Sequence, residues 1–239
     1  MDLVSYDTRI RTINGQYATN SDTNSSSSKI MTVPYVIYEY DGEDIEHLNS
    51  ELYNTIVFEN LKDDCIYDAP PPGSRNYGDR IFGGADLHTK NYESVDTVLN
   101  WVRSVLPRVG YIFATGEMKD QYEPVDYERL GFNSDSFRIV ECWGIHYWKT
   151  ETVPVHTHFP YTISFSYCIN EPNTSPKFVL EGEKIPIEPG KAMFFLSHKD
   201  HEILPSDEDG RCCLIGNVIF IYEKYLGYGD SEKNFRRLN

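Results

Sequence analysis

The stretch FRIVECWGIHYWK, residues 137–149, begins a series of short β-rich runs in the C-terminal half of the chain. Turn-forming residues separate these runs, and Glu188-Pro189-Gly190 is a strong signal for a chain reversal. The later runs are PYTISFSYCIN at 160–170, KFVLEGEKIPI at 177–187, KAMFFLSH at 191–198 and CCLIGNVIFIYEK at 212–224. Strands at such close spacing are typical of an all-β sandwich or barrel. We therefore expect a jelly-roll type of core, which commonly holds a site in its mouth.

The region before residue 137 has helical patterning. Between Asp44 and Leu61, apolar residues recur at helical spacing, and Asp41 or Asp44 is placed to cap the helix. Val95 to Val109 predicts a second helix, and residues 32–40 predict a strand. The expected fold class is α+β but mainly β, with N-terminal helices packed outside the β core.

Four parts follow from these patterns. Residues 1–31 form a polar arm, since Thr19 to Lys29 is too polar to be buried. Residues 32–136 form a helical support region, 137–226 the β core, and 227–239 a tail. The segment 62–93 is rich in Pro, Gly, Asp and Tyr, and loops of this length are often functional. This segment is either a lid over the substrate or simply a long surface loop.

Composition narrows the class of protein. The 239 residues include 22 basic and 37 acidic ones, which gives a net charge of −15. Without a cluster of Lys and Arg to displace phosphate counterions, nucleic acid is a disfavoured partner. We expect no membrane span, because no run of 18 apolar residues occurs, and no signal peptide at the N-terminus. The five cysteines are odd in number and lack CxxC spacing, which favours buried thiols in a reducing compartment.

The most informative motif is His156-Thr157-His158, followed by His201 and then, ten residues later, by Arg211. Residues i and i+2 of an extended strand point to the same face, so His156 and His158 can present two imidazoles to one metal ion. His201 can add a third imidazole from a distant strand. Imidazole suits Fe, Zn, Cu and Ni. Arg211 supplies a fixed positive charge that suits a carboxylate, which predicts an acidic co-substrate.

The other histidines and two tryptophans have structural interpretations. His198 competes with His201 as the third ligand, but the positions of Phe195 and Arg211 favour His201, and we expect His198 at the surface. His146 faces away from its neighbour Tyr147 and is expected to be structural. The remaining residues of this kind are His47, on a predicted helix, His88, in a loop, and Trp143 and Trp148, expected in the core or pocket wall.

The joint spacing of these motifs resembles the 2-oxoglutarate- and Fe(II)-dependent oxygenases over residues 137–222. The similarity is greatest to the prolyl-hydroxylase-like branch and to oxygenases of bacteria and phages. The matching positions are Tyr147, nine residues before His156; the His156-x-His158 pair; Phe195-Leu196-Ser197 before His201; Arg211, ten residues after it; and Asn217 in the same strand.

The resemblance implies a double-stranded β-helix core, and by analogy with the family it implies a role for each matching residue. In this analogy His156, His158 and His201 hold Fe(II), and Arg211 and Tyr147 bind 2-oxoglutarate. The implied activity is a dioxygenase, in particular a hydroxylase that converts 2-oxoglutarate to succinate. The family's usual second ligand is Asp or Glu, and this chain has His158 there, as some members do.

Two other functions stay open. Three histidines also resemble the metal sites of cupin-type proteins, which need no 2-oxoglutarate. A jelly roll can also be a non-catalytic assembly module, including in virus particles. The expected partners are a protein or small-molecule substrate and, for an assembly module, further copies or other subunits. The expected location is the cytoplasm of a bacterium or of a phage-infected cell, or a virion.

Overall fold

The structure is a computed structural model that describes residues 33–64, 86–116 and 125–221. The predicted polar arm and tail, Cys65 and most of the predicted loop at 62–93 lie outside the described residues. Within the described part, no helix is both long and apolar enough to cross a membrane.

In the described ranges, nine strands form two antiparallel sheets. They are β1 Tyr35–Glu39, β2 Phe137–Tyr147, β3 Val153–His156, β4 Ile163–Asn170, β5 Phe178–Leu180, β6 Glu183–Ile185, β7 Lys191–Leu196, β8 His201–Ile203 and β9 Arg211–Phe220. The larger sheet has the order β1-β7-β4-β9-β2 and the smaller one β3-β8-β5-β6. Each pairing is antiparallel. The two sheets form the jelly-roll, double-stranded β-helix core that the sequence predicts.

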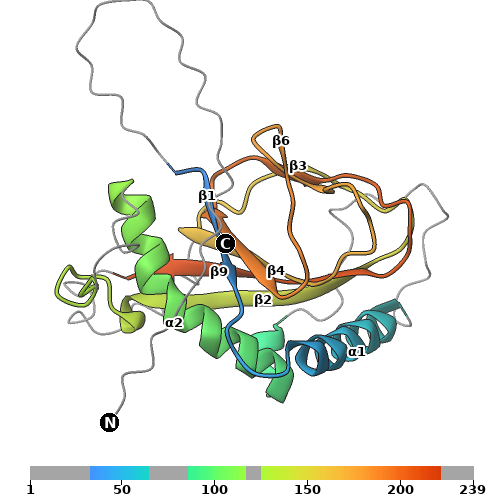
Figure 1. Cartoon of the computed structure of the whole chain (residues 1–239), viewed down its shortest axis with the longest axis horizontal. Coiled ribbons are helices and arrows are strands. Elements are labelled where there is room, and N and C mark those ends of the chain that lie inside the picture. Colours follow the sequence, from blue (N-terminus) through green and yellow to red (C-terminus); the bar gives the residue numbers. More distant parts are fainter. Residues whose placement is uncertain (1–32, 65–85, 117–124, 222–239) are drawn as a thin grey trace, which may run out of the picture.

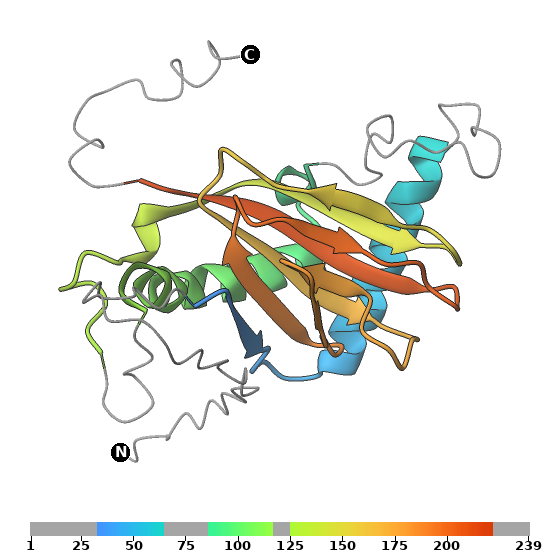
Figure 2. The same cartoon turned by 90° about the horizontal axis from the view of Figure 1, so that it is seen from above.

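Two helices cover the outer face of the five-stranded sheet, as Figures 1 and 2 show. They are α1, Ile45–Asp64, and α2, Glu93–Thr115. Short 3-10 turns, η2 Leu87–Thr89 and η4 Ser134–Ser136, precede α2 and β2. At the start of α1, a carboxylate oxygen of Asp44 accepts a hydrogen bond from the backbone N–H of His47 at 3.2 Å, so Asp44 is the cap. Because both helices lie outside the β core, the predicted external position of the helices is correct.

Two apolar clusters lie on opposite faces of the larger sheet. The first joins the helices to the outer face and includes Leu52, Ile56 and Phe165. The second lies between the two sheets and includes Tyr147, Phe195 and Cys213. Successive side chains of β9 point to opposite faces of the sheet, so Cys212 packs in the first cluster and Cys213 in the second. The space between the sheets is therefore apolar around the predicted site.

Several boundaries differ from the sequence-based predictions. The predicted first strand, 32–40, is shorter as β1, and α2 extends beyond Val109, with Pro107 inside the helix. Pro107 does not end the helix, and the apolar face of α2 continues to pack through Ile112. The Glu188-Pro189-Gly190 turn is confirmed, with Gly190 in the left-handed region at φ 83°.

The four described cysteines are all buried and form no disulfide. Burial raises the pKa of each of these thiols, so they stay protonated and unreactive at neutral pH. The expectation that they act as small buried hydrophobes agrees with this.

Candidate metal centre

The structure brings His156, His158 and His201 together, with one ring nitrogen from each within 4.8 Å of the others. His156 ends β3 and pairs directly with His201, the first residue of β8. His158 lies beyond the end of β3, where its backbone N–H donates to the carbonyl oxygen of Ser197 at 2.7 Å. The assumption that both histidines lie in one extended strand is therefore wrong in detail, yet their Nε2 atoms are 3.2 Å apart.

The Nδ1 atom of each histidine contacts an acceptor, which fixes the ring. His156 Nδ1 lies 2.9 Å from the carbonyl oxygen of Pro154, and His201 Nδ1 lies 3.0 Å from that of Lys199. A carbonyl oxygen only accepts, so both rings carry their proton on Nδ1 when neutral. The lone pairs of Nε2 then face the centre of the cluster. This is the tautomer in which metal-binding histidines are usually held.

His158 is fixed by side chains instead of backbone. Its Nδ1 lies 2.8 Å from Oδ1 of Asn217 and 3.0 Å from the Ser164 hydroxyl. Ser164 also donates to Asn217 Oδ1 at 2.8 Å and contacts the hydroxyl of Ser197 at the same distance. Asn217 in turn donates from Nδ2 to a carboxylate oxygen of Glu141 at 2.8 Å. Of the three rings, that of His158 is therefore the one held by a connected network of polar side chains.

Phenylalanine and tryptophan rings pack against two of the three histidines, His158 and His201. Phe178 stacks on His201 with 5.7 Å between ring centroids, and Phe195 meets the same ring edge-on at 4.8 Å. Trp143 lies 5.5 Å from His158. The histidines open into a cavity of about 680 Å³, whose wall includes Tyr147 and Cys213. The predicted position of Trp143 in the pocket wall agrees with this.

Two of the three imidazoles, those of His158 and His201, are neutral at neutral pH. Burial, reinforced by the neighbouring His156, lowers the pKa of His158 to about 4. Burial also lowers the pKa of His201 to about 3. Because only a neutral imidazole binds a metal through its lone pair, two of the three rings are ready to ligate over a wide pH range.

Arg211 and Tyr147 are placed together but in different surroundings. Tyr147, 1% exposed, ends β2 and lines the cavity. Arg211 starts β9, and its guanidinium carbon lies 5.2 Å from the Tyr147 ring centroid. Its Nε lies 2.9 Å from a carboxylate oxygen of Glu171. Arg211 is on the same face of β9 as Cys213 but does not itself line the cavity.

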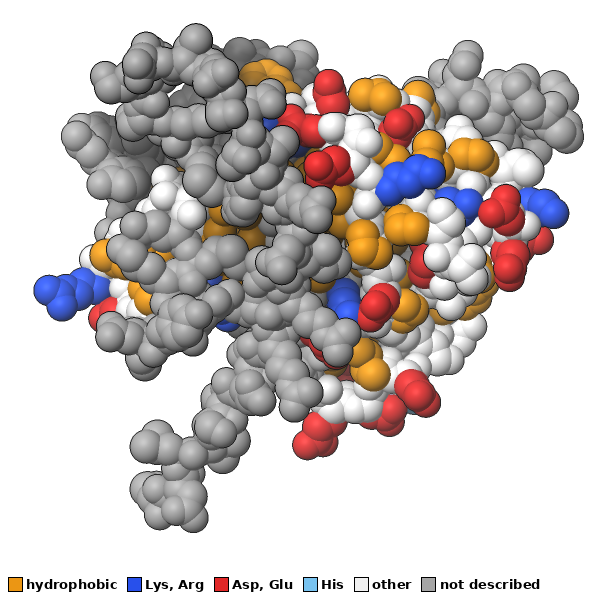
Figure 3. Space-filling view, turned by 45° about the horizontal axis from the view of Figure 1, so that its top comes forward, with side chains coloured by type: hydrophobic (Ala, Val, Ile, Leu, Met, Phe, Trp, Pro, Cys, Tyr) orange, Lys and Arg blue, Asp and Glu red, His pale blue; other side chains and the backbone are white. Residues whose placement is uncertain are grey.

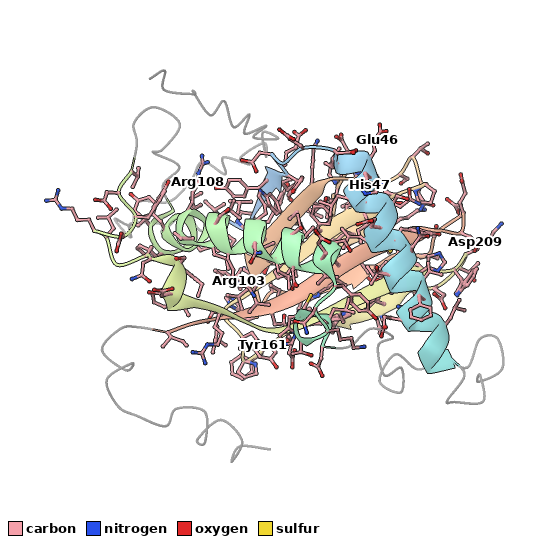
Figure 4. The ribbon with its side chains drawn as sticks, turned by 90° about the horizontal axis from the view of Figure 1, so that it is seen from below. Glu46, His47, Arg103, Arg108, Tyr161 and Asp209 are labelled. Atoms are coloured by element: carbon pink, nitrogen blue, oxygen red, sulfur yellow. The ribbon has the colours of Figure 1, made fainter. Side chains whose placement is uncertain are left out.

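The other histidines lie apart from this cluster. His198 is exposed, as predicted. His146 is buried on the outer face of the sheet, where its Nε2 lies 2.9 Å from the Tyr53 hydroxyl of α1, which agrees with the structural role expected of it. Figure 4 shows His47 on α1, well apart from Tyr161 of the cavity wall. The expectation for Trp148 is wrong: it is 45% exposed and packs against His146.

Three residues of the site were missed in the sequence: Glu141, Ser164 and Glu171. The sequence of β2 carried a signal, since Glu141 is an acidic residue in the middle of a mainly apolar strand. In the structure it directly faces Asn217 in the adjacent β9. A charged residue in the middle of a central strand requires a polar partner. No comparable pattern marks Glu171, which follows the end of β4.

Comparison with known proteins rests on structure. No protein-family model matches the sequence, and no curated protein matches it. Among solved structures, a non-heme monooxygenase, ThoJ, in a nickel complex aligns with a TM-score of 0.50 and 7% identity, over 79% of this chain and 74% of that one. The chain therefore shares the double-stranded β-helix fold of this monooxygenase.

Two further structures align with lower TM-scores. The viral collagen prolyl hydroxylase of Paramecium bursaria Chlorella virus 1, in complex with 2-oxoglutarate, aligns over 79% of this chain and 97% of its own, with 10% identity and a TM-score of 0.47. An oxidoreductase of the 2OG-Fe(II) oxygenase family from Burkholderia pseudomallei has 15% identity and a TM-score of 0.31. The chain spans less than half of that protein, 45%, and 35% of this chain is covered.

Proposed function

We propose that this protein is a 2-oxoglutarate- and Fe(II)-dependent dioxygenase that acts as a hydroxylase. The observation that carries the proposal is the convergence of three imidazoles inside an oxygenase-type jelly roll. Each imidazole has its Nδ1 atom held by an acceptor, so each Nε2 is available. Three protein ligands on one side of an ion leave positions for exogenous groups.

The chemistry of the donor set fits iron. Neutral imidazole is a good ligand for Fe(II), and aromatic rings limit access of water from the protein side. Fe(II) bound by these ligands supplies activation of O2 coupled to decarboxylation of 2-oxoglutarate. The protein's own contribution is to hold His156 and His201 as neighbours across β3 and β8, and His158 against Asn217.

We assign Arg211 and Tyr147 to the distal carboxylate of 2-oxoglutarate. Arg211 carries a permanent charge, and its Nη1 is buried without a hydrogen-bond partner among the described residues. A buried, unused donor is costly, and a carboxylate would satisfy it. Tyr147 lines the cavity, and its ring packs against the Arg211 guanidinium. The assignment requires the side chains of Tyr147 and Arg211 to shift, because Arg211 does not line the cavity.

The prime substrate in this proposal is a protein or a small molecule rather than nucleic acid. Acidic and basic side chains are interspersed among the described residues on the face drawn in Figure 3. With a net charge of −15 on the chain, this surface offers little attraction to phosphates. The four unpaired cysteines favour action in a reducing compartment such as the cytoplasm.

The test is an anaerobic Fe(II) titration of metal-stripped protein, with and without 2-oxoglutarate, followed by visible absorption. A weak charge-transfer band that requires both components is the expected result. The His156→Ala variant serves as the control, since it lacks one of the three imidazoles. Turnover of 2-oxoglutarate to succinate under O2 then tests the dioxygenase activity itself.

A second function is favoured by one observation. The described residues that line the cavity include no Lys or Arg, and Arg211 is engaged by Glu171. This arrangement suits a cupin-type metal protein that uses no 2-oxoglutarate. Fe(II) binding without the charge-transfer band would support this alternative. Absence of metal binding would contradict both functions and favour an assembly module.

A further inference from the structure

The three candidate ligands supply no negative charge. Among the described residues, the cluster consists of His156, His158 and His201, and an imidazole binds a metal ion in its neutral form. A divalent ion held by them alone would keep its full charge in a partly buried cavity. Buried charge is costly unless an opposite charge lies nearby, so a carboxylate close to the cluster has a physical reason to act on it.

Glu141 is a carboxylate in contact with this network. It lies in β2 directly opposite Asn217 of β9, and it lines the same cavity as the three histidines. One of its oxygens accepts from Asn217 Nδ2 at 2.8 Å, and the other accepts from the Tyr161 hydroxyl. Among the described residues, Glu141 forms no ion pair with a basic side chain. Its negative charge is therefore directed to the network behind His158.

The chain of hydrogen bonds has only one consistent direction. An ionised carboxylate only accepts, so the amide of Asn217 must turn its NH2 group to Glu141. Oδ1 of Asn217 then faces His158 and accepts from its Nδ1–H at 2.8 Å. The His158 proton is thereby held on Nδ1, and Nε2 is left as the ligand atom. Glu141 thus sets the tautomer of a ring that it does not touch.

We propose that Glu141 is a positioning residue of the metal centre, acting through Asn217 to orient His158 and to supply the negative charge that the three imidazoles lack. The inference rests on the metal site of the proposed function but not on the use of 2-oxoglutarate. Outer partners of this kind fix ring orientation and raise the basicity of the ligand, and their loss typically lowers metal affinity about 10–100-fold.

The experiment measures Co(II) affinity of the full-length chain by its visible absorption, in the absence of 2-oxoglutarate. Glu141→Gln is expected to bind Co(II) about 10–100-fold more weakly than the unmodified protein. Glu128→Gln is the matched control, because Glu128 is exposed and the substitution removes the same charge. The double variant Glu141→Gln, Asn217→Asp places a carboxylate directly on His158 and is expected to recover most of the affinity.

A second readout needs no metal. Nitrogen-15 NMR of the metal-free protein is expected to show His158 as the Nδ1–H tautomer, and Glu141→Gln is expected to give a mixture, because glutamine can donate to a rotated Asn217 amide. Equal Co(II) affinity and an unchanged tautomer in Glu141→Gln would overturn the inference while leaving the metal site intact. No Co(II) binding by the unmodified protein would instead overturn the metal site, and an unchanged tautomer would then reject the role of Glu141 independently.

Discussion

Arg211 and Glu171 form a buried ion pair, with 2.9 Å between Nε and a carboxylate oxygen and side chains that are 8% and 12% exposed. The other Glu171 oxygen accepts from the backbone N–H and the side-chain amide of Asn173, at 3.2 and 2.7 Å. Both members of the pair are therefore held in place. Removing one partner of such a pair leaves a buried charge without compensation.

We expect Arg211→Met to lower the free energy of unfolding by about 3 kcal/mol, because Glu171 would lose its counter-ion. The double variant Arg211→Met, Glu171→Gln should recover most of this loss, since no unpaired charge is left. Urea denaturation of the two variants and of Glu171→Gln measures the coupling. Equal stability of the single and double variants would show that the ion pair does not contribute.

The same double variant tests the co-substrate assignment in a stable background. It should retain Co(II) affinity, since none of the three histidines is changed, but lose measurable binding of 2-oxoglutarate. Glu171→Gln alone keeps the Arg211 charge and should still bind 2-oxoglutarate. Calorimetric titration of the metal-loaded proteins distinguishes these cases. Unaltered 2-oxoglutarate affinity in the double variant would show that Arg211 has no role in binding.

Two nearby histidines offer a sharp comparison. His201 is 5% exposed and belongs to the cluster, whereas His198 is exposed and does not. His201→Ala should weaken Co(II) binding by more than the roughly 10–100-fold that the loss of an outer partner costs. His198→Ala should leave the affinity unchanged. The reverse result would mean that the third ligand lies three residues earlier in the chain.

The sequence was sufficient for the sheet core because alternation and turn residues are local signals. The strands β2, β4, β7 and β9 coincide with runs that alternate or are apolar throughout. The short β8 was not predicted, since three residues carry too little pattern, and it becomes a strand by pairing with β3 and β5. Non-local pairing of this kind is absent from single-sequence periodicity.

The candidate site likewise has features that the sequence could predict and features that depend on strand pairing. The spacing of His156, His158 and His201 predicted that they converge, and the structure places them within 4.8 Å. The partner of Arg211 could not be predicted, because Glu171 meets it only after β4 and β9 pair in the sheet. The contact between Glu141 and Asn217 likewise depends on the register of β2 against β9, which a bulge shifts between Ile139 and Glu141.

The metal-free protein should lose stability as the pH falls below neutrality. The pKa values of His158 and His201 are lowered by burial to about 4 and about 3, from about 6.5 in the unfolded chain. Between about pH 6.5 and 4 the unfolded state therefore binds more protons than the folded state, so stability falls with falling pH. Below both folded-state pKa values this contribution levels off.

Urea denaturation with a chelator present, at several pH values between about 7 and 5, measures this effect above the range in which carboxylates dominate. The slope should be smaller in a His158→Gln, His201→Gln variant, which cannot take up these protons. An identical slope in the variant would show that the two rings titrate normally in the folded protein.

Gly216 lies where three elements meet behind the site. A Cβ atom there would lie 2.5 Å from the ring of Phe165 and 2.9 Å from the backbone oxygen of Glu141. The ring can shift only by displacing the core, and the backbone oxygen belongs to the adjacent strand. Gly216→Ala should therefore lower the free energy of unfolding by about 1–3 kcal/mol through overpacking. Because Glu141 and Asn217 flank this contact, Co(II) affinity should fall as well.

A double-mutant cycle identifies the origin of the loss of stability in Gly216→Ala. Phe165→Leu removes the ring that the new methyl group would meet, so the combined variant should cost less than the sum of the two single variants, by about 1 kcal/mol. The residual loss then reports the contact with the backbone oxygen of Glu141. Strict additivity of the free-energy changes would show that the Phe165 ring can shift without a loss of stability. In that case the effect on the metal site would have to come from the β2–β9 register alone, since Cys142 is the residue paired with Gly216.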